Sequence, residues 1–317
     1  MLRTRGKRAI FVVVMLCLLG LAVGEEVEFV AGGVRERIVS KAIDIQTSGP
    51  PPEHPSPDLC ESHPFGYRAR APLPWWYELR LESLRQKHGA NVLMAAFQTT
   101  LPDPILAEEY NFSLAADYLA GAVVMPGEVF SLNKHLGPRT VAKGYKEEPM
   151  YSGGRVVPAI GGGVCKIATT LYSVIVLCNL QIVERHPHSM QVPYVSPGQD
   201  ATICYGSLDF RFRNTTQGPI VVWSDTVGNT LFIAVYGPSA PPKVTWHHQI
   251  LSRQELWEVT RVNSSLPKGS RSLVMQGYEG PAVRIWLDIE HTDGRAERRD
   301  LGVDRYQALP TVVEVNP

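Results

Sequence analysis

Two proline-rich segments divide the chain and limit what each part can fold into. Residues 49–57 read GPPPEHPSP, and residues 238–242 read PSAPP. Proline fixes φ and removes a backbone donor, so neither segment continues a helix or a central strand. The 317 residues suffice for two modest domains with cores of their own. We therefore predict a larger domain before the second segment and a smaller domain over 243–317 after it.

The first residues have the pattern of a targeting segment. Basic residues within positions 3–8 precede an apolar run over 9–23, which is shorter than the roughly 20 residues of a membrane span. Ala22 and Gly24 are small, as signal peptidase requires. We expect residues 1–24 to be a cleaved signal peptide or, alternatively, an N-terminal anchor. In both cases the rest of the chain lies outside the cytoplasm, and the membrane is contacted only through this segment.

The charge balance and the cysteines limit the partners and the crosslinks. Lys+Arg and Asp+Glu are both 31, so the chain lacks the basic surplus typical of nucleic-acid binding, and we expect no nucleic-acid partner. Cys60, Cys165, Cys178 and Cys204 follow the targeting segment. If Cys165 and Cys178 share one helix they lie roughly 20 Å apart, too far for a disulfide.

Hydrophobic periodicity predicts the elements of the central domain. Apolar residues spaced three and four apart predict helices over 78–87 and 165–178, and another helix whose N-cap is Ser113. Asn179 suits the end of the second of these helices. Strands are predicted at 92–99, 181–183, 201–205, 208–212, 220–223 and 231–236. We expect 208–212 and 220–223 to be antiparallel partners.

Beyond residue 242 the pattern changes to strands alone. They are predicted at 244–246, 272–275, 283–289 and 312–315, with no helix. The fold class is therefore α+β: helices packed on a mostly antiparallel sheet, followed by a small all-β module.

A glycine triplet followed by a cysteine is the strongest candidate for chemistry. Gly161, Gly162 and Gly163 allow a sharp turn and a close approach to a ligand. Cys165 then opens the predicted helix, where unpaired N–H groups and the helix dipole favour a thiolate. We expect no cofactor, because GGGVCKIATT lacks the glycine that a phosphate-binding loop needs before its lysine.

Histidines and an aspartate later in the chain complete a possible thiol site. His186 and His188 follow a predicted strand, and Asp200 is expected to open the next. A cysteine at a helix start followed by His and Asp is the order of papain-like and transglutaminase-like enzymes. The hypothesis makes Cys165 the nucleophile, His188 the preferred base with His186 as the runner-up, and Asp200 the residue that orients the imidazole.

Two other interpretations of these residues stand beside the thiol hypothesis. Cys165 is also explained as a small buried residue, with the histidines capping backbone groups and Asp200 holding a turn. A metal site built from Cys165, His186, His188 and Cys204 is a weaker alternative, since no CxxC pair supports zinc.

The central domain resembles the VanW family over residues 91–237, and this resemblance makes residues 25–90 an N-terminal extension with its proline-rich part at 49–57. The motifs that carry this resemblance are PGEVFSLN, LGPRT, IGGGVC, TTLY, IVERHPHS, PGQDATICYG and DFRFRN, in that order. Lys166 departs from the glutamine that the family usually has after the cysteine. The resemblance implies an extracytoplasmic envelope protein, and it implies no established reaction.

Residues 243–317 resemble a G5 domain, through LPKGS, VMQGYEG and the Asp293-Gly294 turn. The resemblance implies binding to peptidoglycan or another glycan that contains N-acetylglucosamine. Three functions follow as hypotheses: an envelope protein that binds or acts on a wall polymer, a thiol hydrolase or transpeptidase acting on wall peptides, and a non-catalytic assembly factor. The sequence leaves open whether the protein is an enzyme.

Overall fold

The structure is a computed structural model, which describes residues 27–31, 34–38, 58–75, 77–102, 106–152 and 155–317. Its chain divides into two compact units, one of residues 1–50 with 151–156, and one of residues 51–150 with 157–317. In the first, strands β1 (Val27–Ala31) and β2 (Val34–Ile38) pair antiparallel.

Three features of the sequence fall outside the described residues: the predicted targeting segment, the proline-rich residues 49–57 and Trp76. Among the residues that are described, no helix has the length and apolarity needed to cross a membrane.

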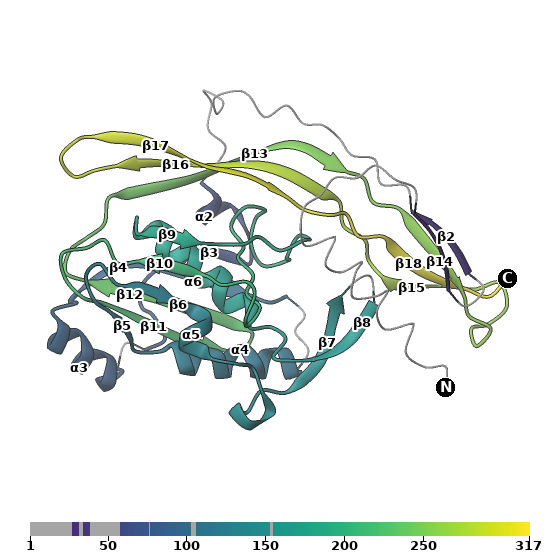
Figure 1. The fold of residues 1–317 in the computed structure, drawn as a ribbon, viewed down its shortest axis with the longest axis horizontal. Helices are drawn as coiled ribbons and strands as arrows, with labels where there is room; N and C mark the ends of the chain where they lie inside the picture. The colour runs from purple at the N-terminus through teal and green to yellow at the C-terminus, as the bar shows by residue number, and fades with distance from the viewer. Residues whose placement is uncertain (1–26, 32–33, 39–57, 76, 103–105, 153–154) are drawn as a thin grey trace. The chain divides into compact units, whose positions relative to one another are not determined.

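The second unit is built around an antiparallel sheet of five strands in the order β3-β4-β12-β11-β5 (Figure 1). The strands are β3 (Gly66–Arg68), β4 (Val92–Thr100), β5 (Ala122–Val124), β11 (Ile220–Val227) and β12 (Thr230–Gly237). Each adjacent pair is antiparallel. The strands predicted at 92–99, 220–223 and 231–236 are therefore confirmed.

Both faces of this sheet are buried, because alternate residues of a strand point to opposite faces. Phe97 and Ile233 pack in one hydrophobic cluster, together with helices α4 (Leu106–Leu119) and α6 (Cys165–Leu177). Ala96 and Ala234, each one position away along its strand, pack in a second cluster with α3 (Leu79–His88). The sheet is thus enclosed by helices, and α6 lies on the face that carries the candidate site.

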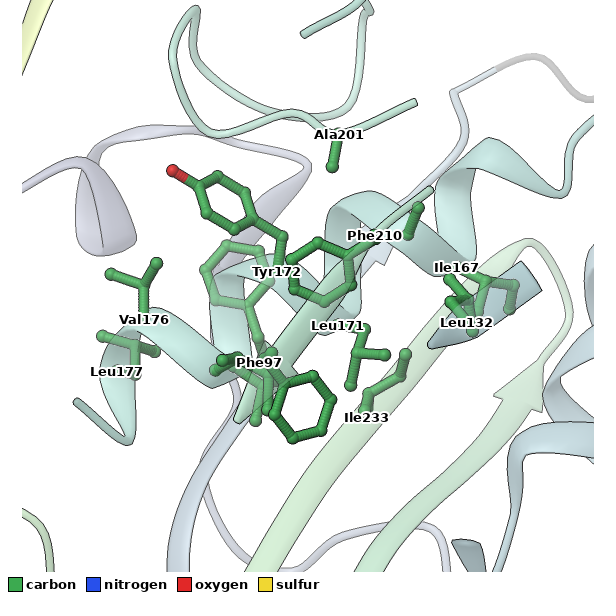
Figure 2. Packing of buried hydrophobic residues seen from close by; sticks show 14 of the residues in the cluster. Phe97, Leu132, Ile167, Leu171, Tyr172, Val176, Leu177, Ala201, Phe210 and Ile233 are labelled. Atoms are coloured by element: carbon green, nitrogen blue, oxygen red, sulfur yellow. The ribbon is translucent and has the colours of Figure 1, made fainter. Parts of the chain in front are cut away.

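Helix α6 is buried along its whole length after the first residue. Its polar side chains are buried too, and each has a hydrogen-bond partner: Lys166, Thr169, Thr170 and Ser173. Figure 2 shows Leu171, Tyr172 and Val176 of this helix among Phe97 and Phe210, which come from elsewhere in the chain. The prediction of a helix over 165–178 is confirmed, with Cys178 as C-cap and Asn179 in the left-handed region at φ 53°.

The predicted start of the helix that contains Ser113 is wrong. Ser113 lies inside α4, which begins at Leu106, and its hydroxyl contacts Thr226 Oγ1 at 2.9 Å instead of capping a helix end. Glu108 and Glu109 occupy the first turn, where the positive end of the helix dipole favours acidic residues. The helix predicted at 78–87 is confirmed as α3.

The predicted pairing of 208–212 with 220–223 is also wrong. Strand β10 (Arg211–Arg213) lies between β6 (Val129–Ser131) and β9 (Gln181–Glu184) in a separate three-stranded sheet. Strand β11 pairs with β12 instead, because Gly228 and Asn229 form a two-residue hairpin loop between them.

Residues 201–205, predicted as a strand, form a loop with an isolated bridge between Cys204 and Leu208. The physical reason lies in α6: the Thr169 hydroxyl accepts from Ala201 N and donates to Ala201 O, both at 3.0 Å. These side-chain bonds replace a strand partner. Asp200 therefore lies in a loop and does not open a strand.

The described part of residues 243–317 contains strands and loops without a helix, as predicted. One sheet has the order β13-β16-β17 and the other β14-β18-β15. The strands are β13 (Lys243–Gln254), β14 (Glu258–Val262), β15 (Arg271–Met275), β16 (Gly280–Glu290), β17 (Ala296–Arg305) and β18 (Thr311–Val315). Strands β14 and β17 were not predicted, because charged residues on their exposed faces hide the alternation. With these sheets, the α+β class is confirmed.

The first of the two sheets shares the core of the preceding domain. Trp246 and Ile285 belong to the hydrophobic cluster of α6, and the Trp246 ring meets the Tyr172 ring edge-on at 5.3 Å between centroids. The predicted domain limits stay a prediction, since this packing does not define which fragment folds alone. The remaining elements are α2 (Leu59–Ser62), α5 (Leu132–Leu136), the 3-10 turn Val141–Lys143, β7 (Glu147–Ser152) and β8 (Arg155–Ile160).

Candidate functional site

Cys165 is the first residue of α6, and its thiol faces a loop that follows much later in the sequence. Its Sγ lies 3.3 Å from Thr202 Oγ1 and 3.5 Å from Ile203 O. The residue is half-buried, and no side chain caps the helix end on which it lies. The N–H groups of Lys166 and Ile167 donate to Gly163 O and Val164 O, at 3.0 Å each. The sulfur lies at the positive end of the helix dipole, which favours a thiolate.

His188 and Asp200 lie on the same loop segment and contact each other directly. His188 Nδ1 is 2.7 Å from Asp200 Oδ2, and His188 N donates to the same oxygen at 2.6 Å. A carboxylate only accepts, so Nδ1 is the donor, and Nε2 is the ring nitrogen left for the hydrogen bond that joins His188 to Cys165. The three side chains form one hydrogen-bonded series from sulfur to carboxylate.

The charges of this series favour an ion pair. Burial acts to raise the pKa of the Cys165 thiol, but the hydrogen bond and charge of His188 outweigh it and lower the pKa to about 7. Burial acts to lower the pKa of His188, but bonds to Asp200 and Cys165 raise it to about 9. Between these two values the thiolate and the imidazolium coexist.

Asp200 is held in its charged form although only 1% of its side chain is exposed. Burial acts to raise its pKa, and the bonds and charges of His188 and Arg185 outweigh burial and lower it. Arg185 also donates to the main-chain carbonyl of Asp200 through Nε at 2.8 Å and Nη2 at 2.5 Å. Its guanidinium lies over the Tyr172 ring, 4.9 Å from the centroid.

The three glycines before the cysteine are explained by contacts inside the chain. A Cβ at Gly161 would lie 2.7 Å from Arg139 Cβ, and one at Gly163 would lie 2.7 Å from Glu108 Cγ. Both glycines have positive φ, 80° and 81°. A Cβ at Gly162 would lie 1.6 Å from Oε1 of the buried Glu148. A role of Gly161, Gly162 and Gly163 in ligand binding stays a prediction.

Replacing Gly162 with alanine should destabilise the fold. The new methyl group overlaps the Glu148 carboxyl, which has to move out of a site where burial raises its pKa to about 7. Overpacking of this kind costs about 1–3 kcal/mol. Thermal unfolding measures the cost, and Gly218→Ala is the matched control, since Gly218 likewise has no positive φ and its Cβ would come no closer than 3.2 Å to another atom, Pro238 Cβ. Equal losses in both variants would contradict the packing explanation.

Two of the sequence candidates lie apart from the series. His186 is 38% exposed, and its Nε2 contacts Glu184 Oε1 at 3.1 Å. Cys204 is exposed, while Cys60 and Cys178 are buried and burial raises the pKa of both thiols. Nowhere in the described part of the chain do three His, Cys, Asp or Glu side chains gather as a metal site would require.

The structure adds residues that sequence reasoning missed. Thr202 contacts the sulfur, Arg185 supports Asp200, and Thr169 fixes the loop between them. All three fall within the motifs TTLY, IVERHPHS and PGQDATICYG, so the signal was present as unusual density of polar residues. Their partners could not be read from spacing, because each contact joins segments that are far apart in sequence.

Comparisons with known proteins agree with the sequence resemblance. Residues 107–236 match the family described as VanW like protein. The Bacillus subtilis (strain 168) protein named Uncharacterized protein YoaR is 40% identical over 130 residues, 41% of this chain and 43% of that protein. Vancomycin B-type resistance protein VanW of Enterococcus faecalis (strain ATCC 700802 / V583) is 30% identical over 120 residues, 36% of this chain and 43% of that protein. The matches span less than half the length of both relatives.

Two solved structures of G5 domains are also similar to part of the chain. The G5 domain of IgA1 protease is 17% identical and covers 26% of this chain and 98% of its own, with a TM-score of 0.17. HP0197-G5 is 20% identical and covers 23% of this chain and 99% of its own, with a TM-score of 0.14.

Proposed function

With residues 107–236 recognised as a VanW-type domain, we propose that this chain is a thiol enzyme of the cell envelope that cleaves or transfers amide bonds of wall peptides. The observation that carries the proposal is the position of the His188 ring, bonded to Asp200 on one side and to Cys165 on the other. Such a series supplies a nucleophile, a proton donor and an orienting carboxylate.

The first half of the proposed reaction forms a thioester. The Cys165 thiolate attacks the carbonyl carbon of the amide, and main-chain N–H groups near Gly163–Cys165 hold the developing oxyanion. His188, as imidazolium, gives its proton to the leaving amine nitrogen, and the C–N bond breaks. The acyl group is then bound to sulfur, and His188 is neutral.

The second half decides between hydrolysis and transfer. Water or a second amine attacks the thioester carbonyl, and neutral His188 takes a proton from the attacking water or amine. The C–S bond breaks, and the thiolate and imidazolium are restored. Hydrolysis and transpeptidation thus use the same residues of the protein. They differ in whether water or an amine reaches the thioester carbonyl at the half-buried Cys165.

The envelope location and the wall substrate rest on other observations. A basic and then apolar N-terminus supports export. One relative carries a name that records resistance to vancomycin. The resemblance of residues 243–317 to G5 domains supports peptidoglycan, or a glycan containing N-acetylglucosamine, as the polymer partner.

The pH dependence of alkylation tests the thiol part of the proposal. Cys165 in the intact chain should alkylate with a midpoint of about pH 7, because His188 lowers the pKa of its thiol to that value. Mass mapping separates this signal from the exposed Cys204. His186→Ala should leave the midpoint unchanged. A Cys165 midpoint near that of a free thiol, about pH 8.5, would show that the site is not built for catalysis.

A mass measurement tests the reaction. Incubation with wall peptides should add an acyl mass to Cys165, and Cys165→Ala should show no such adduct. If the thiol titrates near pH 7 but no adduct or product forms with wall peptides, the substrate class is wrong.

A further inference from the structure

The loop that carries His188 and Asp200 is held from outside the family domain. Gln307 N donates to Ser189 O at 2.7 Å, next to His188. His248, on β13, contacts Pro197 O through Nδ1 at 3.2 Å. A Cβ at Gly198 would lie 2.8 Å from Ile285 on β16. The C-terminal strands therefore line one side of this loop, although the family match ends at residue 236.

Tyr306 follows β17 and contacts the orienting carboxylate itself. Its hydroxyl oxygen accepts from Gly198 N at 2.7 Å, so the single hydroxyl proton is directed to Asp200 Oδ1. The residue is 4% exposed. The bond places the carboxylate so that its other oxygen, Oδ2, faces His188.

Asp304, two residues earlier, supports the same carboxylate through Arg185. Its Oδ2 lies 2.5 Å from Arg185 Nη1, and the guanidinium donates in turn to the Asp200 carbonyl. The side chains of Arg185 and Asp304 are 11% and 10% exposed. The C-terminal strands thus contact Asp200 directly through Tyr306 and indirectly through Asp304 and Arg185.

We infer that Tyr306, supported by Asp304, is a positioning residue of the thiol site, so that the site is completed by the C-terminal strands. This inference rests on the proposed function, because it concerns how Asp200 is aimed at His188. Without the Tyr306 hydroxyl, Asp200 Oδ1 keeps a single side-chain contact, to Arg185 Nη2 at 3.4 Å. The Oδ2 atom keeps its bonds to His188 N and Nδ1, but the carboxylate is held less firmly at Oδ1, so its orientation toward the imidazolium is less fixed.

Tyr306→Phe tests the inference by removing one oxygen and keeping the packed ring. A hydrogen bond of this kind corresponds to about half to one pKa unit, so the alkylation midpoint of Cys165 should rise by that amount. The fraction of thiolate at pH 7 should fall about two- to five-fold. Tyr278→Phe is the matched control, since Tyr278 belongs to the same C-terminal part and is 51% exposed.

Asp304→Asn provides a second variant, which weakens the ion pair with Arg185 and changes the hydrogen bond between Asp304 and Tyr306 while keeping the tyrosine. It should move the midpoint in the same direction by less. Circular dichroism and thermal unfolding confirm that each variant is folded. If folded Tyr306→Phe and Asp304→Asn both keep the wild-type midpoint near pH 7, the two residues serve stability alone and the inference is overturned. If the wild-type protein itself titrates like a free thiol, the proposed function fails instead.

Discussion

Replacing His188 with alanine should move the alkylation midpoint of Cys165 from about pH 7 to pH 9 or above. The bond and charge that lower the thiol pKa are lost, while the burial that raises it remains. At pH 7 the thiolate fraction should fall from about one half to about one per cent. The alkylation rate should fall only about six-fold, because a more basic thiolate is the stronger nucleophile.

The thiolate absorbance and the alkylation rate should therefore be recorded over the same pH series. His186→Ala is the control, since that imidazole contacts Glu184 and is a third exposed. A His188→Ala protein that still titrates near pH 7 would show that the start of α6, and not the imidazole, stabilises the thiolate.

Replacing Asp200 with alanine should produce the largest loss of stability, about 3–5 kcal/mol, as is typical when one partner of a buried charged network is removed. The change leaves the imidazole of His188 and the hydroxyl of Tyr306 without their acceptor, and it leaves Arg185 with one carboxylate fewer. Urea unfolding at pH 7 measures the loss.

The same substitution has a defined pH dependence. The pKa of Asp200 is lowered in the folded state, so its contribution is complete above the unfolded value of about 4 and disappears as the pH falls through the folded value. The difference between wild type and Asp200→Ala should therefore be constant near neutral pH and narrow in acid. Glu255→Ala, at an exposed position, should stay within about 0.5 kcal/mol of wild type. A comparable loss in both variants would rule out a special role for the buried network.

The elements that sequence reasoning predicted well are those whose pattern is local. Helix α6 has apolar residues at three- and four-residue steps, and β4 is a mainly apolar run of nine residues, so each is recognised without knowing its neighbours. The pairing of the strands was predicted less well. Strand β11 pairs with β12 through the two-residue loop Gly228-Asn229. Residues 214–219 also have the composition of a turn, and this favoured the wrong pairing of 208–212 with 220–223.

The site shows the same division between local and distant information. Cys165, His188 and Asp200 were candidates because each lies in a motif with helix-start or loop chemistry, and the structure places them in one series. Tyr306 could not be a candidate. It lies more than one hundred residues from Asp200, in a stretch where the sequence shows no recognisable motif. Only the packing of β16 and β17 against the loop places Tyr306 next to Asp200.

The shared core has a consequence for the proline-rich residues 238–242. Val235 on one side of this segment and Val244 and Trp246 on the other are buried in the same cluster. The segment therefore connects two stretches that are buried in one hydrophobic cluster. A substitution that loosens Trp246 also removes its ring contact with Tyr172, on the helix that begins at Cys165.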